Sequence, residues 1–117
     1  MELAGGGSLA DVIKRKPGPE TAQVVIWMKQ MARALMYIHG EKVCHRDIKA
    51  DNVLLSERGH IMLADFGLAV VANSSAASAA KSKTGTAVYF SPEKADGSDG
   101  YDSKADMWAA GCVLVEL

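Results

Sequence analysis

Three side chains that could do chemistry lie close together in the stretch CHRDIKADNVLL, residues 44–55: Asp47, Lys49 and Asn52. A carboxylate can accept a proton, an ammonium group can offset developing negative charge, and an amide oxygen can bind a hard cation. The same residues would also suit a polar turn between a helix and a strand. The elements around the stretch must decide between a converging site and a simple turn.

A short β-hairpin is expected directly after these residues. The segments Val53–Leu55 and Ile61–Leu63 have the composition of two strands around a glycine-containing turn. If Arg58 and the following glycine form a two-residue loop, Asn52 lies directly opposite Asp65. Opposed Cβ atoms are about 4.5–5.5 Å apart, so these two side chains could share a Mg²⁺ ion. The alternative is an Asn–Asp hydrogen bond that merely closes the hairpin.

Two helices are expected before this hairpin. Ser8 and Asp11 have the spacing of a capping box, and KPGPE at 16–20 ends the short helix that they begin. A longer helix should follow to about His39, with Gly40 as its C-terminal stop. Its apolar residues recur at helical spacing and share one face: Val24, Met28, Met31, Leu35 and Ile38.

A third helix is expected over residues 103–117. No charge occurs between Met107 and Val115, so this helix is apolar on every side and should be buried all round. No apolar run in the chain reaches the roughly 18–20 residues of a membrane span, so we expect no membrane segment and a helix surrounded by protein.

The composition is that of one small globular domain. The chain has 117 residues, of which 49% are hydrophobic and 23% charged, and a net charge of −1. The charge gives no reason to expect nucleic acid as a partner. The three histidines and two cysteines lack the spacing of zinc ligands, and we expect the cysteines to be free thiols in an intracellular protein, cytoplasmic or nuclear.

Four motifs occur in a fixed order: HRDIKADN (45–52), DFG (65–67), SPE (91–93) and SKADMWAAGCVLVEL (103–117). In this order the chain resembles the C-terminal lobe of a eukaryotic protein kinase of the serine/threonine type, similar to the NIMA-related kinases and to kinases of the MAP-kinase cascades. The resemblance implies an α+β fold, mainly helical, whose short β-hairpin carries the metal-binding residues.

The resemblance also implies a partial kinase domain over residues 1–117. Its activation segment would be 65–93 and its central buried helix 103–117. The N-terminal lobe and the last helices of the C-terminal lobe are expected to be absent. GGG at 5–7 would be the connection after the hinge between the lobes, because no phosphate-loop pattern follows it.

The resemblance assigns the catalytic roles. Asp47 would be the base that accepts the proton of the substrate hydroxyl, and Lys49 would lie beside the transferred phosphoryl group. Thr86 would contact the base and orient the substrate. Asn52 and Asp65 would hold the Mg²⁺ ions that bridge the phosphates of ATP.

Nucleotide binding and regulation follow from the same resemblance. Leu54 would form the floor beneath the adenine, which the backbone of Glu2 and Ala4 would face. Arg46 would pair with a phosphate on the activation loop. An upstream kinase could add that phosphate, and the expected acceptors are Thr84 first and Ser82 second.

Four further residues are expected to be structural. His45 and Phe66 would pack in a hydrophobic spine, and Asp106 would hydrogen-bond the backbone of the catalytic loop from the third helix. Glu93 would pair with an arginine beyond residue 117.

The expected function is transfer of the γ-phosphoryl group of ATP to a Ser or Thr hydroxyl of a protein, with Mg²⁺ as the cofactor. The alternative is a truncated, catalytically inactive kinase-like module that binds or regulates. This alternative remains open because the chain contains neither a G-x-G-x-x-G loop nor a V-A-I-K lysine, so the 117 residues alone are expected to be inactive.

Overall fold

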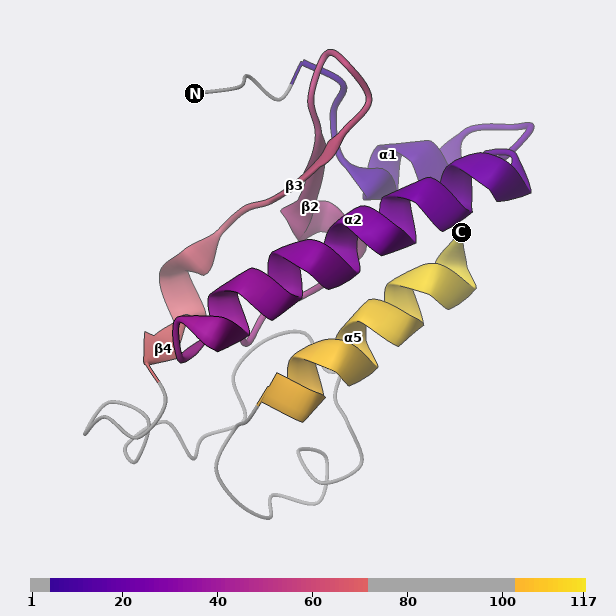
Figure 1. Ribbon diagram of the computed structural model, residues 1–117. Coiled ribbons are helices and arrows are strands. Elements are labelled where there is room, and N and C mark those ends of the chain that lie inside the picture. Colours follow the sequence, from indigo (N-terminus) through magenta and orange to yellow (C-terminus); the bar gives the residue numbers. More distant parts are fainter. Residues whose placement is uncertain (1–4, 72–102) are drawn as a thin grey trace.

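One long helix organises the structure, a computed structural model that describes residues 5–71 and 103–117 (Figure 1). Helices combine with two small antiparallel strand pairs, so the architecture is α+β. In chain order the elements are α1 (Leu9–Lys14), α2 (Thr21–Gly40), β1 (Val43–Cys44), the 3₁₀ turn η1 (Ala50–Asn52), β2 (Val53–Leu55), β3 (Ile61–Leu63), the 3₁₀ turn η2 (Phe66–Leu68), β4 (Val70–Val71) and α5 (Ser103–Glu116).

The capping box at the start of α1 is confirmed. The backbone N–H of Asp11 donates to Ser8 Oγ (3.3 Å), and the backbone N–H of Ser8 donates to Asp11 Oδ2 (2.9 Å). The hydrogen bonds from Ser8 lower the pKa of the Asp11 carboxyl below its ordinary value, and the nearby Lys14 and Arg15 add to this effect. This short helix is therefore fixed at its first turn, next to the glycine triplet.

The glycine triplet lies beside β2 and is hydrogen-bonded to it without forming a strand. The backbone N–H of Gly6 donates to Leu55 O (2.9 Å), and that of Leu55 donates to Gly7 O (2.7 Å). A Cβ on Gly6 would lie 2.9 Å from the Leu55 Cβ and 3.0 Å from the carbonyl oxygen of Ser56. Gly7 has φ = 78°, in the left-handed region that favours glycine. The triplet thus serves close backbone packing against the hairpin.

Gly6→Ala should lower the free energy of unfolding by about 1–3 kcal/mol, because an added methyl group meets backbone and Cβ atoms that cannot yield. Gly18→Ala is the matched control, since a Cβ at Gly18 meets nothing within 4 Å. Thermal unfolding of the two variants measures the difference. Equal melting temperatures would contradict the close packing described here.

Helix α2 buries one face, as its spacing predicts. Trp27, Met31 and Leu35 are buried, and Met28 and Ile38 pack beside them. Trp27 lies next to this face and is buried with it. Its indole N–H donates to Gly59 O (3.0 Å), in the turn of the hairpin. Burial of the large ring and satisfaction of its polar N–H together explain why it lies inward.

The hairpin is held on α2 by two hydrogen bonds, at the end of its turn and at the start of β3. Besides the Trp27 hydrogen bond, the backbone N–H of Ile61 donates to Gln30 Oε1 (3.0 Å). The N–H of Ser56 donates to His60 O (2.8 Å), and Ser56 is almost completely buried. The strand that leads to Asp65 therefore has a fixed position relative to α2.

The predicted register of the hairpin is wrong by one residue. Val53 pairs with Leu63, and the N–H of Ala64 donates to Asn52 O (2.9 Å), so Asn52 lies opposite Ala64 and not opposite Asp65. A two-residue loop needs positive φ at both of its residues. Only Gly59 has it (φ = 80°), and the loop is three residues long, at 57–59.

Helix α5 lies along α2, but only one of its faces is buried in the described part of the chain (Figure 1). Ala109, Ala110 and Val113 are buried, whereas Trp108 is 49% exposed and Val115 is 86% exposed. Burial on all sides is therefore not seen, because the described residues pack against a single face. None of the described helices combines the length and the apolar character needed to cross a membrane.

Candidate active site

Asp106 links α5 to the segment that contains Asp47. Its carboxylate is fully buried and accepts hydrogen bonds from the backbone N–H groups of His45 (2.8 Å, to Oδ2) and Arg46 (2.9 Å, to Oδ1). Buried amides of an irregular segment have no ladder or helix partner, so a buried acceptor is needed to satisfy them. This is the contact between helix and catalytic loop that the sequence suggests.

Arg46, whose backbone makes one of these bonds, has φ = 75°, a left-handed conformation that is uncommon outside glycine. Such backbone strain persists where the surrounding contacts fix it, and here Asp106 accepts from the two consecutive amides, of His45 and Arg46, that lead into the bend. The side chain of Arg46 is also buried. The bend directs the chain from β1 toward Asp47.

His45 ties this segment to the residues before the DFG motif. The backbone N–H of Asp47 donates to His45 Nδ1 (3.2 Å), so Nδ1 carries no proton. The ring must then be neutral, with Nε2–H donating to Ala64 O (2.8 Å). The fully buried ring also contacts Phe66, at 4.6 Å between centroids and a tilt of 60°. Phe66 itself is 44% exposed, so this ring pair is covered on only one side by described residues.

Asp47, Lys49 and Asn52 converge. Asn52 Nδ2 donates both to the backbone oxygen of Asp47 (2.9 Å) and to its carboxylate Oδ2 (3.1 Å). Lys49 Nζ lies 3.8 Å from the same Oδ2. Asp47 keeps 10% of its side chain exposed and Lys49 25%, so the cluster lies at the surface without being fully solvated. A carboxylate held in this way has a fixed orientation and remains accessible to a substrate.

The donor chemistry beside Asp47 fits a hard divalent cation. Within the described residues, both hydrogen bonds of the Asn52 side chain are donated by Nδ2, so neither of them involves Oδ1. Among the described residues, the exposed carboxylate of Asp65 accepts one weak hydrogen bond, from the N–H of Gly67 to Oδ1 (3.4 Å). An amide oxygen and a carboxylate are ligands that Mg²⁺ binds together with phosphate oxygens. In the described residues there is no cluster of three or more His, Cys, Asp or Glu that could hold a metal by itself.

The left-handed conformation of Asp65, and not the strand ladder, sets its relation to Asn52. Asp65 has φ = 57° and ψ = 67°, directly after Ala64, whose N–H is bonded to Asn52 O. If the strand continued through Asp65 in the observed register, the side chains of Asp65 and Asn52 would point to opposite faces of the hairpin. The chain leaves the extended conformation at this residue, so the alternation ends there.

The remaining expected residues are only partly covered by the structure. Leu54 is half-buried on β2, opposite Met62 and bridged to Ser8. The others lie outside the described residues: Glu2, Ala4, Ser82, Thr84, Thr86 and Glu93, with the activation segment beyond residue 71.

His39 is a residue of this site that the sequence analysis missed. It lies in the last turn of α2, and its Nε2–H donates to Asp106 Oδ2 (2.9 Å), the oxygen that also accepts from the His45 amide. The available signal was a histidine at the end of a helix, six residues before the HRD motif. That signal is weak, because a histidine near a helix C-terminus is also favoured by the helix dipole alone.

His39→Ala should lower the free energy of unfolding by about 1–2 kcal/mol, since it removes a hydrogen bond to a buried carboxylate. His60→Ala serves as the control, because His60 is exposed and its side chain makes no hydrogen bond in the described part of the chain. Chemical denaturation measures both variants. A His39 variant as stable as the His60 variant would remove His39 from the site.

Comparison with known proteins agrees with the motifs. The model of the protein kinase domain matches residues 1–117. Human serine/threonine-protein kinase Nek5 is 42% identical over 120 residues, and mouse serine/threonine-protein kinase Nek1 is 40% identical over 119 residues, each covering 100% of this chain. Mitogen-activated protein kinase kinase 1 of Arabidopsis thaliana is 39% identical over 117 residues and 99% of the chain. The chain spans 17%, 10% and 32% of these three relatives, respectively.

Proposed function

The chain belongs to the protein kinase domain family, and on that premise we propose that the protein carrying it transfers the γ-phosphoryl group of ATP to a Ser or Thr hydroxyl of a protein substrate. Its curated relatives are serine/threonine-protein kinases. The one observation that carries the proposal is the double hydrogen bond from Asn52 Nδ2 to Asp47 O and Oδ2, which orients a carboxylate beside an amide oxygen that takes part in neither bond.

Asp47 acts in this proposal as the general base. With Oδ2 already held by Asn52 and near Lys49, the other carboxylate oxygen can accept the proton of the attacking hydroxyl. The fixed orientation reduces the entropy lost in reaching the reactive arrangement. Lys49 offsets negative charge next to the base, where the phosphoryl group would pass.

Asn52 Oδ1 and the carboxylate of Asp65 are the proposed ligands of Mg²⁺, which would neutralise the charge on the ATP phosphates. The hairpin and the bend at Asp65 bring these groups to one end of β2–β3. Leu54, on the same strand, is the proposed floor under the adenine, together with the backbone of Glu2 and Ala4.

Regulation by an upstream kinase forms part of the proposal. Arg46 would pair with a phosphate on Thr84 or Ser82, and Thr86 would help to orient the substrate. The proposed location is the cytoplasm or the nucleus.

Radiolabelled phosphate transfer tests the proposed function. The full-length protein is incubated with γ-labelled ATP, Mg²⁺ and three peptides that differ only in carrying Ser, Thr or Tyr as the acceptor. Label on the Ser or Thr peptide that disappears with a chelator is the expected result. Label on the Tyr peptide alone would contradict the substrate class. A folded protein that binds ATP without any transfer would favour the regulatory module instead.

A further inference from the structure

Strand β3 is less buried than the strand with which it pairs. Its three residues, Ile61–Leu63, are all half-buried, whereas Val53 and Leu55 on β2 are buried. Apolar burial has no preferred direction, so it does not by itself fix a strand along its own axis. A hairpin of two strands is also only marginally stable in isolation. The hydrogen bonds that β3 makes with the rest of the chain therefore decide where it lies.

Gln30 of α2 hydrogen-bonds the outer edge of β3. Both backbone groups of Leu55 bond to the glycine triplet, since its N–H donates to Gly7 O and its O accepts from the N–H of Gly6. Ile61 lies opposite Leu55 and therefore directs its own N–H away from β2. That N–H donates to Gln30 Oε1 (3.0 Å), 31 residues earlier in the chain. The bond thus joins α2 to a backbone group of the hairpin for which β2 provides no acceptor.

The position of β3 determines that of Asp65, which follows it in the chain. From Ile61 to Ala64 the extended backbone advances by about 10 Å. The N–H of Ala64 donates to Asn52 O (2.9 Å), and its O accepts from His45 Nε2 (2.8 Å). Hydrogen bonds weaken steeply with distance and misalignment, so both bonds require β3 at its observed position. A shift of β3 along its axis would weaken them and would move Asp65 relative to Asn52.

We propose that Gln30 is a positioning residue for the cation site. By accepting the hydrogen bond from Ile61 N–H, it fixes β3 along its axis and so sets the carboxylate of Asp65 against the amide of Asn52. Gln30 acts only through the strand and contacts neither the cation nor the substrate. The inference rests on the proposed function, in which Asp65 and Asn52 are the ligands of Mg²⁺. The role needs an acceptor oxygen at position 30, so glutamate should replace glutamine there and leucine should not.

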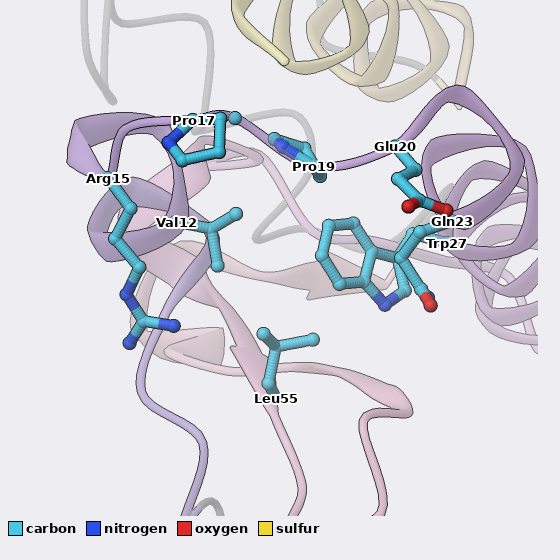
Figure 2. A pocket seen from close by; sticks show the side chains of 9 residues that line it. Val12, Arg15, Pro17, Pro19, Glu20, Gln23, Trp27 and Leu55 are labelled. Carbon is cyan, nitrogen blue, oxygen red and sulfur yellow. The ribbon is translucent and has the colours of Figure 1, made fainter.

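Hydrogen exchange of the Ala64 amide tests the positioning, in the full-length protein without nucleotide or cation. Gln30→Leu removes the acceptor and should speed this exchange by about fivefold or more, because a half-buried N–H loses its partner. Gln30→Glu keeps an acceptor oxygen and should stay within about twofold of wild type. Gln23→Leu is the matched control and should exchange like wild type. Gln23 lies on the same helix, borders a pocket of about 400 Å³ (Figure 2) and forms no hydrogen bond within the described residues.

Binding of Mn²⁺, used as a probe for Mg²⁺, tests the consequence for the cation site. Electron paramagnetic resonance measures it in the presence of a non-hydrolysable ATP analogue. Gln30→Leu should weaken the binding by about threefold or more, less than the loss expected for a residue that bonds a metal ligand directly. Gln30→Glu and Gln23→Leu should bind Mn²⁺ like wild type. Val113→Ala is the control for stability, because it opens a cavity in the core on α5, outside the hairpin, and should change neither measurement.

Faster exchange at Ala64 together with weaker Mn²⁺ binding in Gln30→Leu alone is the expected result. Circular dichroism verifies that each variant is folded, and Gln30→Met, closer in shape to glutamine, replaces Gln30→Leu if that protein does not fold. Unchanged exchange, or equal changes in Val113→Ala, would overturn the proposal and leave Gln30 a residue of general stability. Absence of Mn²⁺ binding in wild type would instead contradict the cation site of the proposed function. The exchange measurement does not depend on that site, so the two failures are distinguishable.

Discussion

Asp47→Asn should lower the rate of phosphoryl transfer by about 10²–10⁴-fold, the usual contribution of a general base. The asparagine has nearly the same shape, and its side-chain oxygen can still accept the hydrogen bond from Asn52 Nδ2. It cannot accept a proton at neutral pH. The expected defect is therefore in kcat, with nucleotide binding and stability close to those of wild type.

The control for this prediction lies in the same loop. Asp51 is exposed, carries the same charge and forms no hydrogen bond with Asp47 or Asn52 in the described structure. Asp51→Asn should keep the transfer rate within a few-fold of wild type. If both variants have equal rates, Asp47 is not the base, and the orientation imposed by Asn52 has another purpose.

Asp106→Ala should have the largest effect on stability, about 3 kcal/mol or more. Removing the carboxylate leaves the buried N–H groups of His45 and Arg46 without their acceptor, and an unsatisfied buried donor costs about 1–3 kcal/mol. His39 loses its partner as well. Urea unfolding measures the change in the free energy of unfolding, and hydrogen exchange of the two amides measures the local loosening.

Two comparisons sharpen the Asp106 result. Asp106→Asn keeps one acceptor oxygen and should lose less stability than Asp106→Ala. Glu116→Ala changes an exposed acid on the same helix and should be neutral within about 0.5 kcal/mol. An Asp106→Ala protein that unfolds at the wild-type urea concentration would show that the buried carboxylate does not hold the catalytic segment.

Local rules predicted the helices well. The capping box at Ser8 and Asp11 depends on residues near in sequence and is present in the structure. The stop was predicted slightly too early, because α2 includes Gly40, Glu41 is its C-cap, and Lys42 (φ = 62°) has the left-handed conformation expected of the glycine. The all-apolar pattern of 107–115 predicted a helix correctly, but not which faces are covered. Burial depends on which other segments pack against a helix, and a single helix does not encode them.

Longer-range relations could not be read from the sequence. Strands β1 and β4 pair Val43 with Val71, and each strand has only two residues. A strand of two residues is too short to show an alternating pattern in the sequence. The predicted hairpin register was wrong because it depends on a two-residue loop, and a single glycine is equally compatible with a loop of three residues. The left-handed bends at Arg46 and Asp65 are fixed by tertiary hydrogen bonds and local turns, and neither residue is glycine.

The sharpest test of the proposed mechanism is at Asp65, whose carboxylate is proposed to hold one cation together with the amide of Asn52, beside Asp47. The measurement is the Mg²⁺ concentration that gives half the maximal transfer rate at saturating ATP, for wild type, Asp65→Asn and Asp51→Asn. Mutation of a residue that only hydrogen-bonds to a metal ligand lowers metal affinity by roughly 10–100-fold. Loss of a ligand itself should lower the affinity at least as much. We predict that Asp65→Asn needs at least about tenfold more Mg²⁺ and that Asp51→Asn needs no more than wild type. The same Mg²⁺ requirement in all three proteins would show that Asp65 does not hold the cation.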